Sequence, residues 1–404
     1  MKILVFSQYF YPENFRINIL CRELVRRGHQ VTVLTGYPQY PIGQIYEGYG
    51  FDIPYEKEWE GVHIERVRVH PRGSNALGML RNCIDYVVES NRWVRNCKDK
   101  YDAVYVFEVS PVTVGLPAVT YKKKYHVPMI FNLQDLWPEN VEEVLGIRIK
   151  PVTWVINRIV DCIYSASDKI LCSSNSFVKN LQQRGVDSGK LIFWPQFCRK
   201  PDIQNMKKPE CFTPEKINVV FAGNLGDAQG LDLLLQAANE LKEQPLHWYL
   251  VGDGRARTRL EKLVLEYDLA DYVTFVGRVS EDEADRYVHF ADFAYLSFRN
   301  NKIFDMTLPA KLQTYLACGT PILAAAGGES AQLIAEHKCG VVCAPKLEDL
   351  ILAAKNLIAM KEEDRRSMSE AAMACYNARF TMDMLVDQLL QIMDEEVKKQ
   401  ECSE

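Results

Sequence analysis

Long apolar runs are missing from this sequence of 404 residues. No stretch approaches the roughly 18 consecutive apolar residues that a membrane-spanning helix needs, so no such span is predicted. The first ten residues (MKILVFSQYF) also lack the apolar region and cleavage site of a signal peptide, and we interpret them as a first strand. These absences predict a soluble cytoplasmic protein, or at most one that is peripheral at the inner face of the plasma membrane.

Clustered metal ligands are missing as well. The twelve cysteines stand apart, without a C-x-x-C pair or a cysteine and histidine cluster of zinc spacing. No strand ends in an Asp-x-Asp motif for a metal-bound diphosphate, and Asp282 and Asp285 have the pattern of a solvated helix start. We therefore expect no metal ion and no other cofactor.

Several functional classes lack their signatures. The chain has no Walker lysine loop, no H-E-x-x-H and no G-x-S-x-G motif. Neither half carries G-x-G-x-x-G with a following acid, which disfavours an NAD-binding protein. The net charge of −5 gives no general attraction for phosphate backbones, so we expect no nucleic-acid partner.

What is present is a regular alternation of short apolar strands and amphipathic helices. In residues 15–27, Ile17, Leu20, Cys21 and Leu24 recur with the helical period. Strands are predicted at residues 3–6, 30–34, 102–107, 128–132, 169–171, 218–222, 247–251, 273–276, 293–296 and 322–324. Strands that alternate with helices predict an α/β fold with parallel, doubly wound sheets.

A segment rich in proline and charge divides this pattern into two halves. Residues 198–216 contain three prolines and little apolar periodicity, which is typical of an interdomain linker. We predict one Rossmann-like domain over residues 1–197 and a second over residues 217–380. A last helix is predicted at residues 382–398, and one arrangement packs it back on the first domain.

The loops that follow strands are the expected ligand sites, since open α/β sheets bind ligands beyond the carboxyl ends of their strands. Residues 222–230 (AGNLGDAQG) form such a loop before a helix, and a helix start favours an anion. An ordinary tight turn is the alternative. The candidate ligand contacts in this loop are Gly223, Asn224, Gln229 and Gly230.

Two further loops of the second half have similar positions. In residues 251–255, Asp253 beside Gly254 suits a ligand hydroxyl and Arg255 suits a phosphate, although a solvated surface cation is the favoured interpretation of Arg255. In residues 275–279, the backbone around Arg278 and Val279 suits the edge of a nucleobase, with an ordinary turn as the alternative.

The most informative segment is residues 308–321 (LPAKLQTYLACGTP). Pro309 precedes a helix at residues 310–317 and Gly319 follows it. Lys311 lies in the first turn, where its charge opposes the helix dipole. An anion at the same helix end, such as a leaving diphosphate, would compensate, whereas a solvated lysine is the alternative.

In the first half, residues 9–16 connect the first strand to the first helix. They contain Glu13, Asn14 and Arg16, and Arg16 opposes the dipole of its helix just as Lys311 does.

Residues 133–139 (LQDLWPE) follow another strand of the first half. Asp135 beside Trp137 suits sugar hydroxyls and a sugar face, and Glu139 lies close by in sequence. A helix cap is the alternative role for Asp135.

Taken in this order, the loops resemble those of a GT-B glycosyltransferase of family 4 over nearly the whole chain. The resemblance rests on the opening Tyr-Pro-Glu, on residues 27–36 (RGHQVTVLTG) and on the four loops of the second half. The sequences of residues 11–18, 35–41, 135–139 and 311–319 are similar to those of WbuB-like transferases, which build bacterial surface polysaccharides. The resemblance implies two Rossmann-like domains with a cleft between them, the second holding the donor.

The chain departs from the family pattern at three places. Asn224 and Gln229 stand where the family usually has Arg and Lys. Met306 and Thr314 stand in place of two Glu, and Gln134 replaces a His. Neutralisation of the diphosphate is therefore expected from Lys311, Arg16, Arg255 and helix N-termini, and Thr314 takes the place of the usual ribose contact.

The resemblance implies a hexosyltransferase-type enzyme that moves an N-acetylated deoxyhexosamine from UDP to a lipid-linked saccharide acceptor. The product belongs to O-antigen, capsule or exopolysaccharide synthesis, and the family implies retention of anomeric configuration. The expected catalytic residues are Lys311, Asp135 and Arg16. Glu13, Asn14, Trp137 and Glu139 are expected at the acceptor. Two alternatives are a non-catalytic protein that binds sugar nucleotides and a GT-B UDP-sugar 2-epimerase.

Two basic and aromatic segments bear on the possible membrane partner. Residues 71–100 and 147–163 mix Arg and Lys with large apolar residues, including Trp154. Such helices can lie on anionic lipid. Ordinary helices that face the protein core are the alternative.

Overall fold

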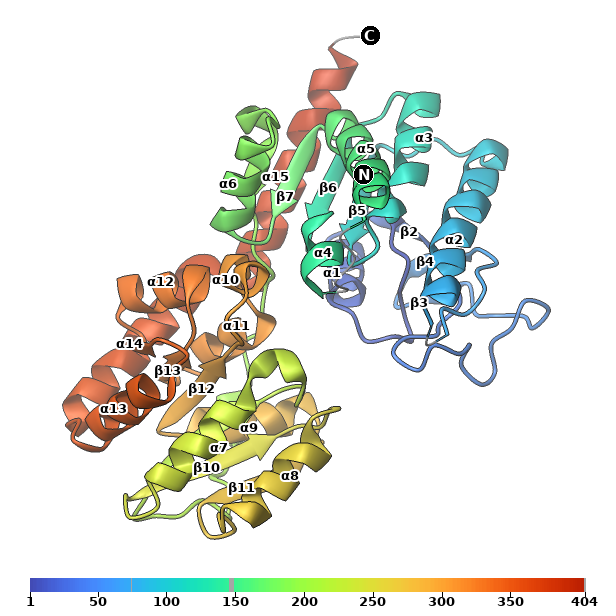
Figure 1. The fold of residues 1–404 in the computed structure, drawn as a ribbon. Helices are drawn as coiled ribbons and strands as arrows, with labels where there is room; N and C mark the ends of the chain where they lie inside the picture. Colours follow the sequence, from blue (N-terminus) through green and yellow to red (C-terminus); the bar gives the residue numbers. More distant parts are fainter. Residues whose placement is uncertain (74, 145–148, 403–404) are drawn as a thin grey trace. The chain divides into compact units, whose positions relative to one another are not determined.

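The computed structural model describes residues 1–73, 75–144 and 149–402 (Figure 1). Residues 147 and 148 of the second basic segment therefore lie outside the described residues. The chain divides into two compact units, Met1–Trp194 with Val386–Glu404 and Pro195–Leu385. Each unit is an α/β structure with its own sheet. Among the described residues, no helix has the length and apolarity needed to cross a membrane.

Unit 1 contains an eight-stranded sheet of order β3-β4-β2-β1-β5-β6-β7-β8. Its elements are β1 (Lys2–Phe6), α1 (Arg16–Arg26), β2 (Gln30–Thr35), β3 (Glu58–Trp59), β4 (Val62–Arg66), α2 (Ala76–Asn96), β5 (Ala103–Glu108), η1 (Val112–Val114), α3 (Gly115–Tyr125), β6 (Met129–Leu133), α4 (Glu139–Val144), α5 (Lys150–Ala166), β7 (Lys169–Cys172), α6 (Asn175–Gln183), η2 (Ser188–Lys190) and β8 (Leu191–Phe193).

The strands of unit 1 were correctly expected to be parallel, with one exception. β1 pairs with β2 and β5, and β5 pairs with β6, all in parallel. The exception is β3, which is antiparallel to β4. This short edge hairpin was missed because two residues carry no readable alternation. The central strands β5 and β6 are buried along their whole length, as expected for a parallel sheet with helices on both faces.

Helices α2, α3 and α5 are neighbours in one layer on unit 1, with α3 in contact with both others (Figure 1). On the helix α1, Ile17, Leu20, Cys21 and Leu24 are buried, as the helical period predicts. Gly28 follows with φ +86, a left-handed conformation that ends the helix.

Unit 2 contains a six-stranded sheet of order β11-β10-β9-β12-β13-β14, and all its pairs are parallel. Its elements are η3 (Ile203–Asn205), β9 (Ile217–Ala222), η4 (Asp227–Gln229), α7 (Leu231–Glu240), β10 (Leu246–Val251), α8 (Arg257–Glu266), β11 (Val273–Gly277), α9 (Glu281–Phe290), β12 (Phe293–Ser297), α10 (Lys302–Met306), α11 (Ala310–Ala317), β13 (Ile322–Ala325), α12 (Gly328–His337), β14 (Gly340–Cys343), α13 (Leu347–Ile358), α14 (Glu362–Arg379) and α15 (Met382–Glu401).

The segment 198–216 packs on unit 2. Cys198 N donates to Phe380 O, and the ring of Phe212 packs at a tilt against that of Tyr249. Arg199 forms ion pairs with Asp282 and Asp285. The prediction of a solvated Asp285 is wrong, because Arg199 covers a carboxyl that is only 8% exposed, and burial raises its pKa to about 6.

The last helix, α15, continues from unit 2 into unit 1. In unit 1, Arg27 of α1 forms an ion pair with Asp387, and Lys169 Nζ lies 3.8 Å from Glu396 Oε1. Leu389 and Met393 are buried on the same helix. Its apolar side therefore completes the core of unit 1.

Candidate functional site

The order of strands in unit 2 locates its ligand site. The sheet runs outward from β9 in one direction and from β12 in the other, so the chain reverses direction between these two strands. Loops at such a reversal leave a crevice at the carboxyl edge of the sheet. Here the two loops are joined, since Ser297 Oγ donates to Gln229 O at 2.7 Å and Arg299 N donates to Ala228 O at 3.0 Å.

Lys311 points into this loop cluster. Its Nζ donates to Gln229 Oε1 at 2.5 Å and lies 4.0 Å from the centre of the Phe221 ring. Burial lowers the pKa of Lys311 to about 7. Among the described residues, no carboxylate forms an ion pair with it, so this cation has only an amide oxygen and the rings of Phe221 and Phe298 to offset its lost hydration.

The start of α11 is held in place by Tyr315, one turn after Lys311. The Tyr315 hydroxyl accepts from Ala222 N at 3.0 Å and is also within hydrogen-bond distance of Ala222 O and Tyr295 O. Pro309 caps the helix with an extended backbone. The helix that carries Lys311 is thereby fixed to the end of β9 and to the middle of β12.

Gly223 leaves its backbone open beside the lysine. It has φ +141, and a Cβ atom there would lie 3.6 Å from Lys311 Nζ. By contrast, a Cβ at Gly252 would lie 2.0 Å from Gly223 O, and one at Gly254 would lie 2.5 Å from Leu225 O. Gly252 and Gly254 are therefore required because two loops pack closely on each other. The sequence alone could not distinguish this structural role from a contact with a ligand.

The remaining predicted donor contacts of this edge differ in their surroundings. The Asp253 side chain accepts from Gly254 N at 2.8 Å and lies 3.7 Å from Arg257. Arg255 and Arg278 are exposed, and Val279 is half-buried after Gly277.

The polar loop residues lie around the glycines. The Asn224 side chain lies between Gly226 and Gly254. Gly230 has φ +60, and a Cβ there would meet Arg299 at 3.3 Å. Thr314 Oγ1 donates to Ala310 O at 3.3 Å and lies 3.7 Å from Cys198 Sγ. The structure thus brings Gly223, Gln229 and Lys311 together, whereas Thr314 faces the segment that enters unit 2.

Two residues near this site were missed from the sequence. Arg299 follows β12 and lies against Gly230, with an ion pair to Asp232. Asp305 precedes Met306, and its carboxyl would contact a Cβ at Gly327 at 2.9 Å. Arg299 could have been found as a cation directly after a predicted strand; Asp305 carries no such signal.

Unit 1 has an equivalent reversal between β1 and β5. The loop after β1 contains Glu13, which is 1% exposed. Its carboxylate accepts from Phe10 N at 3.2 Å, Gln39 N at 2.9 Å and Tyr40 N at 2.6 Å. Burial raises the pKa of Glu13 to about 7. This side chain joins two loops, a role that its buried position suits better than direct contact with a sugar.

Arg66 is a half-buried charged residue that the sequence did not reveal. It donates to Gly36 O at 2.7 Å and to Tyr11 O at 2.5 Å, and its guanidinium lies 5.3 Å from the centre of the Tyr49 ring. Asn14 is exposed next to this loop, and the half-buried Arg16 is the first residue of α1. No acidic residue shares that first helical turn.

The loops after β5 and β6 bring two carboxyl groups together. Asp135 Oδ2 accepts from Ser110 N at 3.1 Å and from Ser110 Oγ at 2.6 Å. Glu108 Oε2 accepts from Gln134 N at 3.1 Å and Asp135 N at 3.0 Å. Burial raises the pKa of Glu108 well above its usual range, and Asp135 adds to this shift. Sequence reasoning missed Glu108, because its strand end lies far from Asp135 in the chain.

Trp137 and Glu139 follow in the same loop. Trp137 is half-buried, and Glu139 Oε1 accepts from Asn180 Nδ2 at 3.3 Å. The Asp135 side chain is hydrogen-bonded to Ser110. In the sequence, Asp135 precedes Glu139, which is the first residue of α4. No group of three His, Cys, Asp or Glu that could hold a metal ion occurs among residues 1–73, 75–144 and 149–402.

Both units match models of known domains. Residues 14–195 match the glycosyl transferase 4-like domain, and residues 202–374 match glycosyl transferases group 1. This chain is a glycosyltransferase. The Escherichia coli (strain K12) protein assigned to colanic acid biosynthesis as glycosyl transferase WcaI is 25% identical over 339 residues, covering 79% of this chain and 82% of that protein.

Solved structures of other proteins share the fold of this chain. Sucrose-phosphate synthase from Thermosynechococcus elongatus superposes with a TM-score of 0.74 at 16% identity over 98% of both chains. Anabaena HepE in complex with UDP gives a TM-score of 0.71 at 14% identity, covering 98% of this glycosyltransferase and 100% of HepE. The expected GT-B architecture is confirmed.

Proposed function

We propose that this glycosyltransferase moves a sugar from UDP to a lipid-linked saccharide during synthesis of a bacterial surface polysaccharide. The observation that carries the proposal is Lys311, a cation without an ion-pair partner among the described residues, beside the open backbone of Gly223. The relatives in colanic acid biosynthesis and in the amylovoran biosynthesis of Erwinia amylovora support a polysaccharide product.

The donor is bound by unit 2 in this proposal. Negative charge grows on the leaving diphosphate as the bond to the sugar breaks, and Lys311 with the start of α11 offsets that charge. Asn224 and Gln229 are uncharged and cannot neutralise the diphosphate. Arg299 supplies a second cation instead, because it lies against Gly230 at the same loop. HepE crystallised with UDP and with UDP-glucose, which supports UDP as the carrier. The reaction then needs no metal ion, and EDTA should leave its rate unchanged.

The acceptor is bound by unit 1. An acceptor hydroxyl oxygen forms a bond to the anomeric carbon on the same face from which the diphosphate oxygen departs, which retains the configuration. The hydroxyl proton must be removed in this step. Asp135 is the proposed proton acceptor, because Ser110 holds its Oδ2 by two hydrogen bonds and leaves the other oxygen for a ligand. Arg16 at the start of α1 supports the diphosphate, and Asn14, Trp137 and Glu139 bind the acceptor sugar.

The donor sugar is proposed to be an N-acetylated deoxyhexosamine, transferred with retention at the cytoplasmic face of the membrane. The test is release of UDP from a panel of UDP-sugars, including UDP-N-acetylfucosamine, with a synthetic lipid-diphosphate sugar as acceptor. Acceptor-dependent release with one donor is expected, and an NMR coupling constant of the product would report its anomeric configuration. UDP binding without release from any donor would contradict the proposal.

A further inference from the structure

Large apolar side chains that remain exposed are concentrated on unit 1. Of the thirteen such residues among the described ones, eleven belong to unit 1, and only Leu265 and Leu352 belong to unit 2. A folded protein normally exposes such side chains singly. Their unequal distribution indicates that unit 1 presents a surface to an apolar partner.

The outer side of α2 carries a continuous apolar stripe. Leu77, Leu80, Ile84 and Val88 recur every three or four residues, so they lie along one line of the helix. Leu77 is 79% exposed. α5 contributes Trp154 and Val155, of which Trp154 is 61% exposed. These six residues define the α2–α5 face.

Both helices begin at the same edge of the sheet. α2 connects the parallel strands β4 and β5. α5, which is preceded by the short helix α4, leads into β7, a strand parallel to β6. Both helices therefore run from the carboxyl edge of the sheet back to its amino edge. Both also contact α3, which lies between them (Figure 1). The apolar residues near the starts of α2 and α5 therefore lie at the end of unit 1 that carries the loops assigned to the acceptor.

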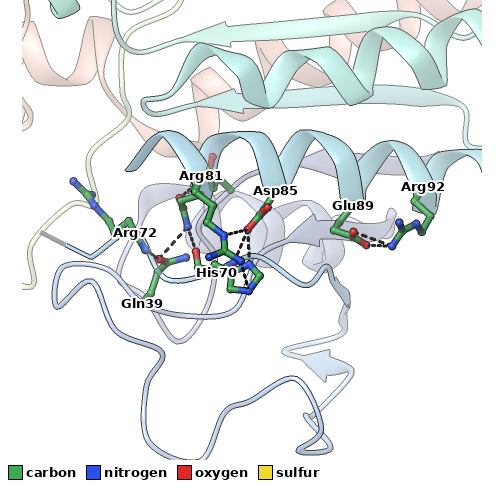
Figure 2. Close-up of polar contacts among 9 residues, drawn as sticks. Gln39, His70, Arg72, Arg81, Asp85, Glu89 and Arg92 are labelled. Carbon is green, nitrogen blue, oxygen red and sulfur yellow. Dashed lines mark hydrogen bonds and ion pairs between the residues drawn. The ribbon is translucent and has the colours of Figure 1, made fainter. Parts of the chain in front are cut away.

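Basic side chains border the apolar stripe. Arg92 Nη1 lies 2.8 Å from Glu89 Oε2, and Arg81 Nε lies 3.8 Å from Asp85 Oδ2 (Figure 2). In each pair the arginine is the outer partner, since the two arginine side chains are far more exposed than the two carboxylates. The acids thus hold the guanidinium groups toward solvent, and Arg95 adds a further exposed cation.

Buried amides connect this face to the acceptor loops. Asn82 of α2 accepts from Gln8 Nε2 at 2.5 Å and donates to Gln39 Oε1 at 3.1 Å. Gln39 Oε1 also accepts from Arg72 N at 2.6 Å (Figure 2), and the backbone N of Gln39 donates to Glu13 Oε1 at 2.9 Å. The position of α2 therefore fixes the position of the loops after β1 and β2.

We propose that the α2–α5 face docks on an anionic lipid bilayer. Exposed apolar and aromatic side chains enter the interface while the bordering arginines meet lipid phosphates, the combination by which amphipathic helices bind membranes. The cation-π contact of Trp154 with Arg158, at 5.5 Å, joins the two kinds of group in one place. The acceptor loops then lie next to the surface from which a lipid-linked saccharide projects, and in this respect the inference rests on the proposed function.

The test is co-sedimentation of the full chain with vesicles of phosphatidylcholine, with and without phosphatidylglycerol. Binding to the anionic vesicles that weakens with added salt is expected. The double variant Leu80→Asp with Ile84→Asp should bind at least about tenfold more weakly. Arg92→Gln with Arg95→Gln should lose about fivefold for each arginine removed.

The matched control replaces the two exposed leucines of unit 2, Leu265→Asp with Leu352→Asp, and should bind like the unchanged protein. Circular dichroism verifies that every variant is folded. Absence of vesicle binding by the unchanged protein, or equal loss in the control, would overturn the inference. So would a dimer in light scattering that Leu80→Asp with Ile84→Asp dissociates without any vesicle binding, because the face would then be a contact between copies of the chain.

Vesicle binding is measured without substrate, so its outcome is separate from that of the proposed reaction. UDP release with a short, soluble acceptor analogue should be unchanged in Leu80→Asp with Ile84→Asp. If no donor in the panel is used, the proposed reaction fails while the vesicle result still decides the docking surface.

Discussion

The two units use buried charge at their carboxyl edges in different ways. In unit 1, Glu13 and Arg66 direct their charged groups to backbone atoms of neighbouring loops. In unit 2, Lys311 contacts only an amide oxygen and two aromatic rings among the residues that the structure describes. Burial moves both pKa values toward neutrality, raising that of Glu13 and lowering that of Lys311, each to about 7. A buried charge that the backbone satisfies holds the fold, whereas one left with weak partners indicates where a ligand of opposite charge binds.

Replacing Asp135, the proposed proton acceptor of unit 1, should lower turnover the most. Asp135→Asn keeps the size of the side chain and an oxygen for Ser110 but removes the basic carboxylate. If Asp135 accepts the proton, turnover should fall by about 10²–10⁴-fold. UDP release at saturating substrate measures this, with Asp161→Asn on the exposed side of α5 as control. Full activity would remove Asp135 from the mechanism.

Replacing Lys311, the buried cation of unit 2, should lower turnover somewhat less. Lys311→Ala removes the charge proposed to face the leaving diphosphate, and turnover should fall by about 10²–10³-fold. Lys355→Ala, an exposed lysine on α13 of the same unit, is the matched control and should leave turnover unchanged. Near-normal turnover of a folded Lys311→Ala variant would show that the diphosphate is neutralised elsewhere.

The pH dependence of UDP binding tests whether the buried Lys311 of unit 2 contacts the diphosphate. A diphosphate beside Lys311 favours its protonated form, so binding should raise the pKa of Lys311 from about 7. Affinity should then be constant below that pH and should fall by up to about tenfold per pH unit above it, until the raised pKa is reached. Calorimetry in buffers of different ionisation enthalpy measures the proton uptake. Equal uptake by Lys311→Ala would assign the effect to another group.

The smallest effect is expected from Glu13. Because its pKa is raised in the folded state to about 7, the folded protein holds a proton that the unfolded chain releases above about pH 4.3. Its contribution to the free energy of unfolding is therefore largest below that pH and decreases by about 1–3 kcal/mol as pH rises to 7. Relative to Glu13→Gln, the unchanged protein should lose stability between pH 5 and pH 8. Parallel unfolding curves of the two proteins would contradict this.

Local sequence signals were sufficient for the elements and for part of the site. The helix predicted at residues 310–317 has these bounds in the structure, Ala310–Ala317, because Pro309 and Gly319 mark its ends. Lys311 was recognised as a cation at a helix start, and its surroundings agree with an anion site. Glu108 and Arg66 escaped notice, because a charged residue at the end of a strand looks solvated until its neighbours are known.

The sequence by itself determined the alternation of strands and helices, the two α/β units and the loops in which a ligand site had to lie, because apolar period, proline and glycine act on neighbouring residues. Only the tertiary structure decided which charges are satisfied. Glu13 finds its backbone partners 26 and 27 residues away, Asp285 finds Arg199 86 residues away, and Lys311 finds Gln229 82 residues away. The free energy of a buried charge depends on partners that folding brings from distant parts of the chain, and no local pattern records them.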